Sequence, residues 1–315
     1  MKLFRAIPAV CIALAAPSVA QTEKLIGLDV QVIDTRTGDI PELLGPNDFE
    51  VYVDGQRTSI RKLDIESPPL DVVFVIYMSN PGLSTPLERQ RFTGGLRAAA
   101  GALRPEDRAG VVRGPGPRGV TLALTADSSA VTRGLSGGVA QPEKERLFDA
   151  AASALSLFPK QASLVRRRAI IAITDDIERH SETKADGLQE DLLTAGVTLH
   201  EVMLALTRAG SRVNVGGPQL PIPQITGVVG RRGSSGGGSL VGIVRATGGE
   251  TLIGDDFDEV LPGLLRHLRL RYTLTVAVPA GLKAFHKTEV GLSPAKRLQF
   301  PNVTVRTRIG YYSAP

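Results

Sequence analysis

The stretch DVVFVIYMSN, residues 71–80, decides the fold of this chain. Its residues 72–76 form an unbroken apolar run rich in β-branched side chains, which predicts a strand buried on both faces, as in the middle of a parallel sheet. A polar loop follows at residues 79–82, and a helix-like segment begins at about Ser84. Ligands of open α/β sheets bind where such strands end. We therefore expect any functional site at residues 77–81.

Residues 69–269 alternate between apolar strands and segments with helical periodicity. RAIIAIT, residues 168–174, is a second fully apolar strand, and it also ends in polar residues, Asp175 and Asp176. This alternation predicts an α/β domain with a central, mostly parallel sheet and helices on both faces. Residues 207–238 interrupt the pattern with many Gly, Pro and Ser residues, which predicts a long flexible loop.

The two flanks of this domain, residues 21–68 and 270–315, are rich in β-strand patterns. In the first flank, Asp54-Gly55 lies between two alternating runs, which is the strongest short-range signal for a β-hairpin. In the second flank, residues 272–278 and 303–309 alternate in the same way. The simplest packing joins both flanks into one small β-sandwich, with the α/β domain inserted between them.

Residues 1–20 have the features of a secretory signal peptide. Lys2 and Arg5 form a charged start, a short apolar run follows, and Ser18-Val19-Ala20 predicts cleavage after Ala20. The run is too short for a permanent membrane anchor. We therefore expect a secreted or periplasmic chain with no transmembrane segment after cleavage. The mature part would contain no cysteine, because Cys11 lies within the signal peptide.

The charge of the chain is mild. The formal net charge is +5, and removal of Lys2 and Arg5, with no acidic residue, reduces it to +3. The basic residues are spread along the sequence, so we expect no nucleic-acid partner. Aromatic residues make up only 4% of the chain and Trp is absent, so the core must be mostly aliphatic.

Five segments occur in an informative order. They are NDFEVYVDGQ (residues 47–56), RAIIAITDD (168–176), ATGGE (246–250), RYTLTV (271–276) and VRTRIGYY (305–312). In this order the chain resembles the secreted von Willebrand factor A (VWA)-related proteins of acidobacteria, over nearly all of its mature length. The resemblance implies a Rossmann-like sheet with helices on both faces. It also implies a metal-ion-dependent adhesion site, with the pattern Asp-x-Ser-x-Ser after the first strand, a Thr from a middle loop and an Asp after the fourth strand.

In this sequence the adhesion-site pattern is damaged. Tyr77 stands in place of the first Asp, Ser79 matches the first Ser, and Pro81 stands in place of the second. The Thr is missing near Glu145, whereas Asp175 matches the final acid. Mg²⁺ requires six oxygen ligands in a near-octahedral arrangement. We therefore expect the remnant, Ser79 and Asp175, not to bind Mg²⁺ or Mn²⁺ tightly, and we expect no other cofactor.

The leading hypothesis is an exported, non-enzymatic interaction or adhesion-type VWA module that binds a protein partner through its strand-end loops. The expected contact residues are Tyr77, Ser79, Asn80, Asp175, Asp176 and Glu178, with Tyr77 as an aromatic anchor. One alternative is a hydrolase-like enzyme that uses Asp175, Asp176, Glu178 and His180. Another alternative is a purely structural component of the cell envelope.

Other chemistry is weakly indicated. The four histidines are not paired at the spacing of zinc ligands, and His200 and His267 are expected to be structural. No Gly-x-Ser-x-Gly turn joins a strand to a helix, as the nucleophile of an α/β-hydrolase would require. The run Arg166-Arg167-Arg168, directly before the second buried strand, is expected to be a solvated turn.

Overall fold

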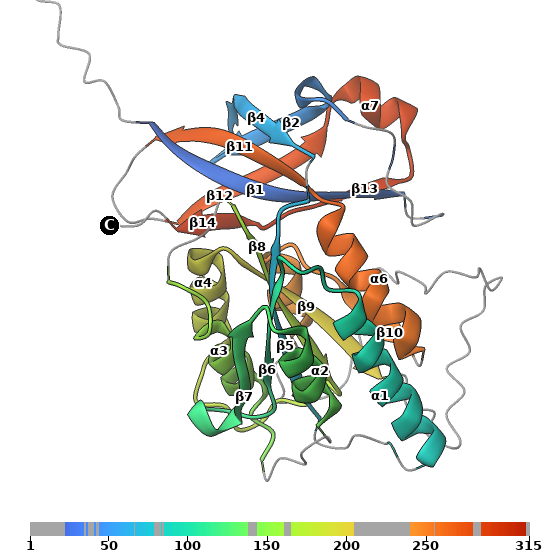
Figure 1. The fold of residues 1–315 in the computed structure, drawn as a ribbon. Coiled ribbons are helices and arrows are strands. Elements are labelled where there is room, and N and C mark those ends of the chain that lie inside the picture. The colour runs from blue at the N-terminus through green and yellow to red at the C-terminus, as the bar shows by residue number, and fades with distance from the viewer. Residues whose placement is uncertain are drawn as a thin grey trace, which may run out of the picture.

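The computed structural model describes residues 23–34, 36, 41, 44–65, 67–78, 83, 85–137, 144–160, 165–204, 240–254, 256–279 and 285–312. These residues form an α/β unit and a β-sandwich, which lie one upon the other (Figure 1). The predicted signal peptide, residues 1–20, and the predicted loop, residues 207–238, lie outside the described residues. No described helix combines the length and the apolar character that a membrane span requires.

A six-stranded sheet forms the centre of the α/β unit. Its strands, in spatial order, are β10 (Thr251–Gly254), β9 (Val197–Leu204), β8 (Arg167–Thr174), β5 (Leu70–Tyr77), β6 (Arg108–Val112) and β7 (Val120–Thr125). All neighbours are parallel except β7, which is antiparallel to β6 at the edge. When the strands are numbered along the chain, this is the doubly wound order 3-2-1-4-5-6. The chain adds strands on one side of β5 first and on the other side from β8 onward, so the strand order reverses between β5 and β8.

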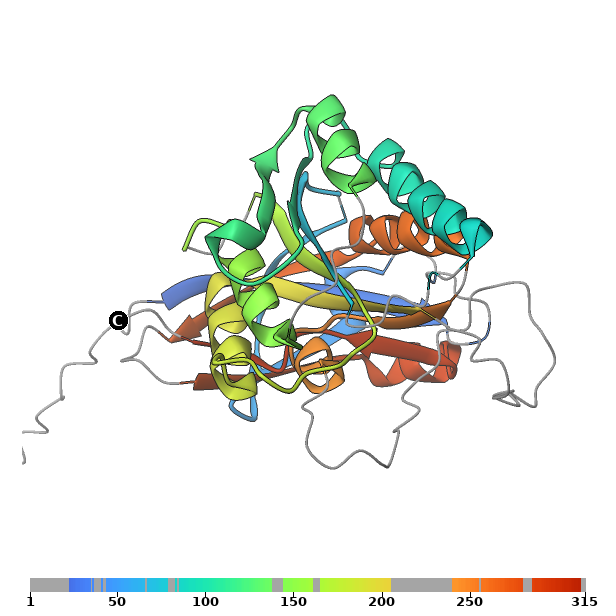
Figure 2. The same cartoon turned by 90° about the horizontal axis from the view of Figure 1, so that it is seen from below.

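Helices cover both faces of this sheet (Figure 2). One layer contains α1 (Pro86–Gly101), α2 (Ser128–Ser136) and α6 (Phe257–Arg269), and the other contains α3 (Leu147–Leu155), α4 (Ala185–Ala195) and α5 (Val241–Ala246). Phe74 packs in the first layer and Val75 in the second. Because β5 and β8 are buried on both faces, both are apolar throughout their centres, as the sequence predicted.

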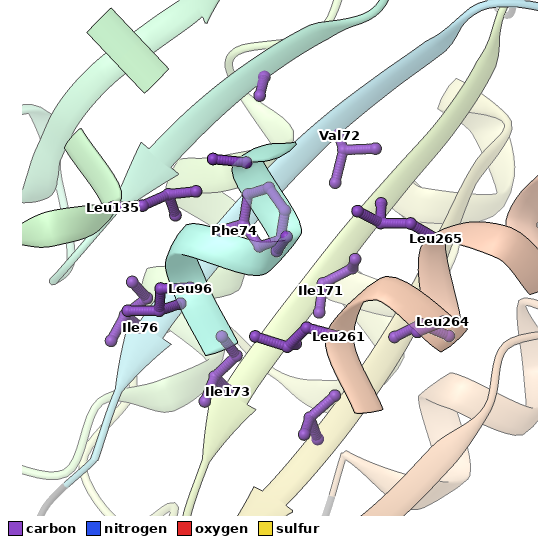
Figure 3. Packing of buried hydrophobic residues seen from close by; sticks show 14 of the residues in the cluster. Val72, Phe74, Ile76, Leu96, Leu135, Ile171, Ile173, Leu261, Leu264 and Leu265 are labelled. Carbon is purple, nitrogen blue, oxygen red and sulfur yellow. The ribbon is translucent and has the colours of Figure 1, made fainter. Parts of the chain in front are cut away.

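The first layer is closely packed (Figure 3). Phe74 and Ile76 of β5 lie beside Leu96 of α1, and Leu261 of α6 lies over Ile173 of β8. Helices α1 and α6 approach each other closely at Gly95, where an added Cβ atom would lie 2.2 Å from the Cβ atom of Phe257. The fold therefore requires the absence of a side chain at this position.

Both ends of the chain build the β-sandwich. One sheet has the order β13-β1-β11-β4 and the other β14-β12-β2-β3; the strands are β1 (Glu23–Asp34), β2 (Phe49–Val53), β3 (Gln56–Thr58), β4 (Ile60–Asp64), β11 (Tyr272–Pro279), β12 (Phe285–Leu292), β13 (Val303–Arg306) and β14 (Gly310–Tyr312). Leu28, Val51 and Leu274 share one core. The sandwich predicted from the two flanks is therefore confirmed. Two short helices, η1 (Pro46–Asp48) and α7 (Pro294–Gln299), join its strands.

The Asp54-Gly55 turn joins β2 to β3, as predicted. Asp54 has φ 50° and Gly55 has φ 78°, which are the two positive angles that a tight hairpin of this kind needs. The strand predicted after the turn, however, is divided. Its first part, β3, pairs with β2, whereas β4 crosses to the other sheet and pairs with β11.

The sandwich covers the amino-terminal ends of the parallel strands, and this corrects the expected solvated turn at residues 166–168. Arg167 is 3% exposed; its guanidinium donates to the carbonyl oxygen of Leu268 and lies 3.1 Å from Asp29 of β1. Arg166 pairs with the buried Asp71 at 2.7 Å. The buried Arg168 instead donates to the carbonyl oxygens of Pro159 and Ala195 within the α/β unit, so protein contacts rather than water hold most of this basic run.

A buried charged cluster also joins the two units. Glu250, which is 2% exposed, accepts a hydrogen bond from Gln31 of β1 at 2.8 Å and lies 3.1 Å from His267 of α6. Burial alone would raise the pKa of Glu250, but His267, His200 and Arg271 outweigh it and lower the pKa to about 2. Burial lowers the pKa of His200 to about 3, so this imidazole is neutral at physiological pH.

Candidate functional site

The candidate site lies where β5 and β8 end, at the reversal of strand order and at the end of the sheet away from the sandwich (Figure 1). Tyr77 ends β5 and Thr174 ends β8, and the two are register partners in the sheet. The predicted contact residues Ser79 and Asn80 lie outside the described residues. The described part of the site consists of the groups around them.

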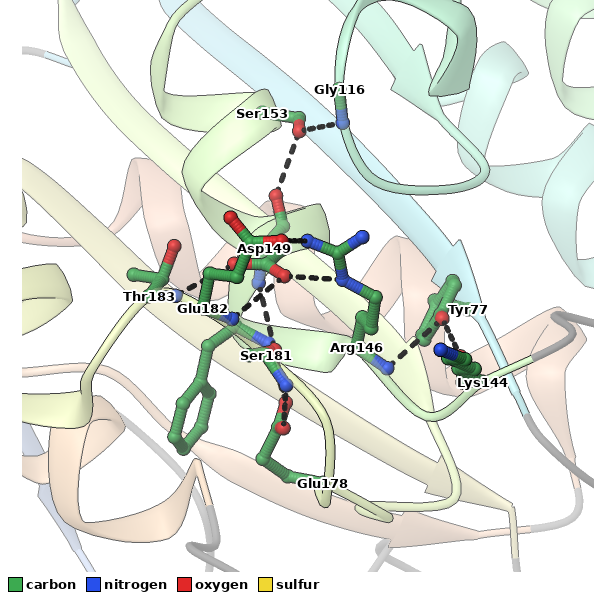
Figure 4. Close-up of polar contacts among 11 residues, drawn as sticks. Tyr77, Gly116, Lys144, Arg146, Asp149, Ser153, Glu178, Ser181, Glu182 and Thr183 are labelled. Atoms are coloured by element: carbon green, nitrogen blue, oxygen red, sulfur yellow. Dashed lines mark hydrogen bonds and ion pairs between the residues drawn. The ribbon is translucent and has the colours of Figure 1, made fainter.

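Tyr77 is 2% exposed, which corrects the expectation of an aromatic anchor for a partner. Its hydroxyl donates a hydrogen bond to the carbonyl oxygen of Lys144 at 2.6 Å and accepts one from the backbone N–H of Arg146 at 3.1 Å (Figure 4). Burial raises the pKa of the phenol, so it remains protonated. The side chain at the position where the sequence resemblance implies a carboxylate thus holds the segment before α3 against the strand end.

Glu178 is also turned inward. Its carboxylate accepts hydrogen bonds from the backbone N–H of Phe148 at 2.8 Å and from the hydroxyl of Ser181 at 2.7 Å. Phe148 lies in the first turn of α3, where unpaired N–H groups favour a negative charge. With 6% exposure, Glu178 does not offer the exposed partner contact that we expected; it stabilises the start of α3.

Asp149 completes a brace between α3 and the loop before α4 (Figure 4). It accepts hydrogen bonds from the backbone N–H groups of Glu182 at 3.1 Å and Thr183 at 2.8 Å, and from Arg146 Nε at 2.7 Å. Burial alone would raise the pKa of Asp149, but the bonds from Thr183, Arg146 and Glu182 outweigh it and lower the pKa. This brace was not predicted from the sequence, although Arg146 and Asp149 stand at the three-residue spacing of a helix-surface ion pair.

Asp176 connects β8 to α5. Its φ of 53° is left-handed, and its backbone N–H donates to the hydroxyl of Thr174 at 3.1 Å. Its carboxylate accepts a hydrogen bond from the backbone N–H of Leu240 at 3.0 Å. Burial of Glu201, followed by the negative charge of Asp176, raises the pKa of Glu201 to about 8. Asp176 thus connects the end of β8 to the start of α5 by hydrogen bonds, and its charge acts on the buried carboxyl group of Glu201.

The four residues of the hydrolase-like alternative do not act as one cluster in the described structure. The exposed His180 lies 3.6 Å from Glu145, and its backbone N–H donates to the carbonyl oxygen of Glu145. Glu178 is engaged at α3, and Asp176 at Leu240. Asp175 is partly exposed beside them. His180, Glu178 and Asp176 are therefore held by three different neighbours.

The described residues do not fit a divalent metal ion. Within the described ranges, no group of three or more His, Cys, Asp or Glu residues is placed to hold one. The phenol of Tyr77, at the position where the sequence resemblance implies a carboxylate, is neutral and already hydrogen-bonded. Neighbouring groups that orient ligands do not replace a missing ligand.

Neither a protein-family model nor a curated protein sequence matches this chain. Among solved structures, an aerotolerance-related membrane protein from Bacteroides fragilis is 18% identical, with a TM-score of 0.43 over 63% of this chain and 98% of that one. Mussel byssus proximal thread matrix protein 1, in a form with a zinc-occupied MIDAS motif, is 9% identical, with a TM-score of 0.44 over 69% of this chain and 49% of that one. At this level of identity the similarity concerns the fold alone.

Proposed function

We propose that this chain is an exported, non-catalytic interaction module that binds a protein partner through the face at the ends of β5 and β8, without a bound metal ion. The position of Tyr77 carries the proposal. A buried phenol, hydrogen-bonded to Lys144 and Arg146, stands where the adhesion-site pattern has its leading carboxylate. Export is proposed from the signal-like residues 1–20.

The exposed groups around this face are charged. The side chains of Arg179, His180 and Glu182 are 63%, 53% and 85% exposed, and the brace around Asp149 fixes the loop that carries Glu182. A rigid loop that presents both signs of charge suits a protein partner, because complementary charges orient an encounter and exclude wrong partners. We propose that Asp175, Asp176, Ser79 and Asn80 contribute further contacts.

The hydrolase-like alternative has less support. A general base and its partners must lie within hydrogen-bond reach of one another. Glu178, Asp176 and His180 are each held by a different neighbour. A purely structural role remains distinct from both, because it requires no specific partner at this face.

Site-specific cross-linking in the envelope and secreted fractions of the producing cells tests the proposal. A photoreactive residue would replace Glu182 on the proposed face or, as a control, Leu298 of α7, which is 85% exposed on the sandwich. We expect one protein to cross-link from position 182 and not from 298, equally in EDTA and in Mg²⁺. A cross-link lost in EDTA would contradict metal-free binding. Absence of any cross-link at 182 would favour the structural role.

Thermal unfolding of residues 21–315 tests the absence of a metal. A ligand that binds only the folded state raises its stability by mass action. We expect the Tm in millimolar Mg²⁺ or Mn²⁺ to equal the Tm in EDTA within about 1 °C. If a metal ion did bind, a concentration ten times its Kd would add about 1.4 kcal/mol to the free energy of unfolding and raise the Tm measurably. A shift that disappears in Asp175→Ala would contradict this expectation and place a metal at the remnant site.

A further inference from the structure

We propose that the cavity between the β-sandwich and the amino-terminal ends of β8 and β9 binds a small organic anion, whose acidic group is held by Arg308 and Tyr311. The cavity lies at the end of the parallel strands opposite the proposed partner face. Ligand binding in this cavity is therefore separate from the proposed partner binding and does not depend on it.

The cavity has the size of a small-molecule site. Its volume is about 460 Å³, within the usual range for ligand pockets. Its walls come from β1, the first residues of β8 and β9, the end of α4, and β14. Two units of the fold meet here, and such junctions are preferred places for ligand sites.

The cavity walls are strongly basic. The charged groups that line it are Lys24, Lys160, Arg166, Arg167, Arg168, Arg308 and a single acid, Asp29. Asp29 pairs with Arg167 at 3.1 Å, and Arg166 pairs with Asp71 outside the cavity. Among the described residues, Arg308 and the exposed Lys24 and Lys160 have no carboxylate within ion-pair distance. The local field therefore favours a negatively charged occupant.

Two donors in the wall have unused hydrogen-bonding capacity. Tyr311 is 4% exposed, and its hydroxyl has no hydrogen-bond partner among the described residues. Arg308 donates from Nη2 to the carbonyl oxygen of Gly27 at 2.7 Å, but its Nε–H has no partner within the same part of the chain. Buried tyrosine hydroxyls nearly always have a partner. Neither of these two atoms is exposed to the cavity in this structure, so an acidic oxygen would accept from both only after a small shift of the cavity wall.

The titration behaviour of the two residues agrees with this geometry. Burial raises the pKa of Tyr311 to about 12, so the phenol is a proton donor at physiological pH. Arg308 and Tyr311 each influence the pKa of the other, which places them within electrostatic reach of each other. A cationic donor and a neutral donor in the wall of one cavity can together bind one acidic headgroup.

The rest of the lining suits a short apolar body. Leu25 of β1 is 52% exposed at the cavity wall, whereas Ile26, Leu192, Leu193 and Val197 behind the wall are already covered by protein. Inorganic anions would leave this surface in contact with water, whereas an aliphatic or aromatic tail would cover it. The inferred ligand is therefore a carboxylate or phosphate monoester on a compact apolar group.

Isothermal titration of residues 21–315 with hexanoate, hexyl phosphate and inorganic phosphate, in 150 mM NaCl, tests the site. We expect saturable one-to-one binding of at least one hexyl compound, and the tighter of the two identifies the headgroup. Tyr311→Phe should weaken it at least tenfold. Tyr52→Phe, the same change at a residue outside the cavity, should leave it unchanged.

A second variant distinguishes a loss of ligand binding from a loss of folding. Lys24 is exposed at the wall of the cavity, so Lys24→Glu should fold normally and weaken hexyl-anion binding several-fold by charge repulsion. Absence of saturable binding of both hexyl compounds would overturn the proposal. So would equal affinity of the wild type and Tyr311→Phe, or binding of inorganic phosphate alone, which would indicate non-specific attraction to the basic walls.

Discussion

The hydroxyl of Tyr77 joins two segments that are 67 residues apart in sequence. One hydrogen bond reaches the carbonyl oxygen of Lys144, and another comes from the N–H of Arg146 directly before α3. A carboxylate at this position would lie beside Glu178, whose charge already raises the pKa of Tyr77. At the residue scale, the hydroxyl of Tyr77 therefore makes this strand end a closed internal contact.

Removal of this hydroxyl tests its role. Tyr77→Phe keeps the buried ring but leaves the carbonyl oxygen of Lys144 and the N–H of Arg146 without their partner. We expect the free energy of unfolding, measured by urea titration, to fall by about 1–2 kcal/mol. Tyr52→Phe, at a partly exposed tyrosine of β2, is the control and should change stability by less than about 0.5 kcal/mol. An unchanged midpoint for Tyr77→Phe would mean that water replaces the hydroxyl.

Glu201 makes the stability of the protein depend on pH. Its buried carboxyl has a pKa of about 8, raised first by burial and then by Asp176. Because the pKa in the folded state is above the ordinary value of 4.5 for glutamate, the contribution to stability is fully present below pH 4.5 and is lost as the pH rises through about 8. His200 has the opposite sign: its lowered pKa makes its contribution complete above pH 6.5 and lost as the pH falls. Above pH 6.5, His200 therefore adds no pH dependence to the free energy of unfolding, and the pH dependence that comes from Glu201 can be measured separately from it.

We expect Glu201→Gln to remove part of the pH dependence between pH 6.5 and 8. In the wild type, Glu201 should lower the free energy of unfolding with rising pH, by at most about 1.4 kcal/mol per pH unit. Urea titrations at several pH values, with the exposed Glu190→Gln as the control, measure the difference. Parallel profiles for the wild type and Glu201→Gln would show that Glu201 does not titrate in this range.

At the scale of elements, the contact between α1 and α6 depends on one glycine. A Cβ atom at Gly95 would overlap the backbone and Cβ atom of Phe257, and these atoms belong to the first turn of α6. The rings of Phe92 and Phe257 meet edge to face, with centroids 5.5 Å apart. The two helices can therefore relieve an added methyl group only by moving apart.

Gly95→Ala should destabilise the protein although alanine favours helices. Overpacking typically costs about 1–3 kcal/mol, which exceeds the gain of about 1 kcal/mol in helix propensity. Gly101→Ala is a matched control in the same helix, because no atom lies within 4 Å of the added Cβ position. It should be neutral or slightly stabilising. Equal thermal midpoints for the two variants would mean that α1 and α6 are less tightly packed than described.

At the scale of the whole molecule, Glu250 connects the two units. It follows α5, contacts His267 of α6 and accepts from Gln31, which is 219 residues away in the sandwich. Arg271 and Arg306, at 3.8 and 3.6 Å, approach from the sandwich side. The buried charge thus makes the orientation of one unit on the other specific.

Glu250→Gln should destabilise both units together. Removal of one partner from a buried charged cluster typically costs about 3–5 kcal/mol, because the remaining charges stay buried. The lowered pKa of Glu250 makes its contribution present above pH 4.5 and lost as the pH falls through about 2. Thermal unfolding at pH 7, with the transition of each unit recorded separately, measures this loss of stability. Glu289→Gln, with a 58% exposed side chain, is the control, and equal stability of the two variants would contradict the assigned role.

The sequence by itself determined the order of layers. The apolar runs at β5 and β8, the alternating flanks and the Asp54-Gly55 turn each encode burial or turn geometry locally, so their positions were predictable. The helix α2, the strand β12 and the division of the hairpin strand were not predicted, because their patterns are short and packing decides them.

Only the tertiary structure decided what the polar side chains do. The sequence indicated that Tyr77 replaces a carboxylate, but not that its hydroxyl meets Lys144, 67 residues away. It indicated a basic run at residues 166–168, but not that the sandwich covers it and leaves a cavity beside Arg308. Polar partners are chosen by distance and direction in space, and these depend on packing between segments far apart in the chain, which no local pattern records.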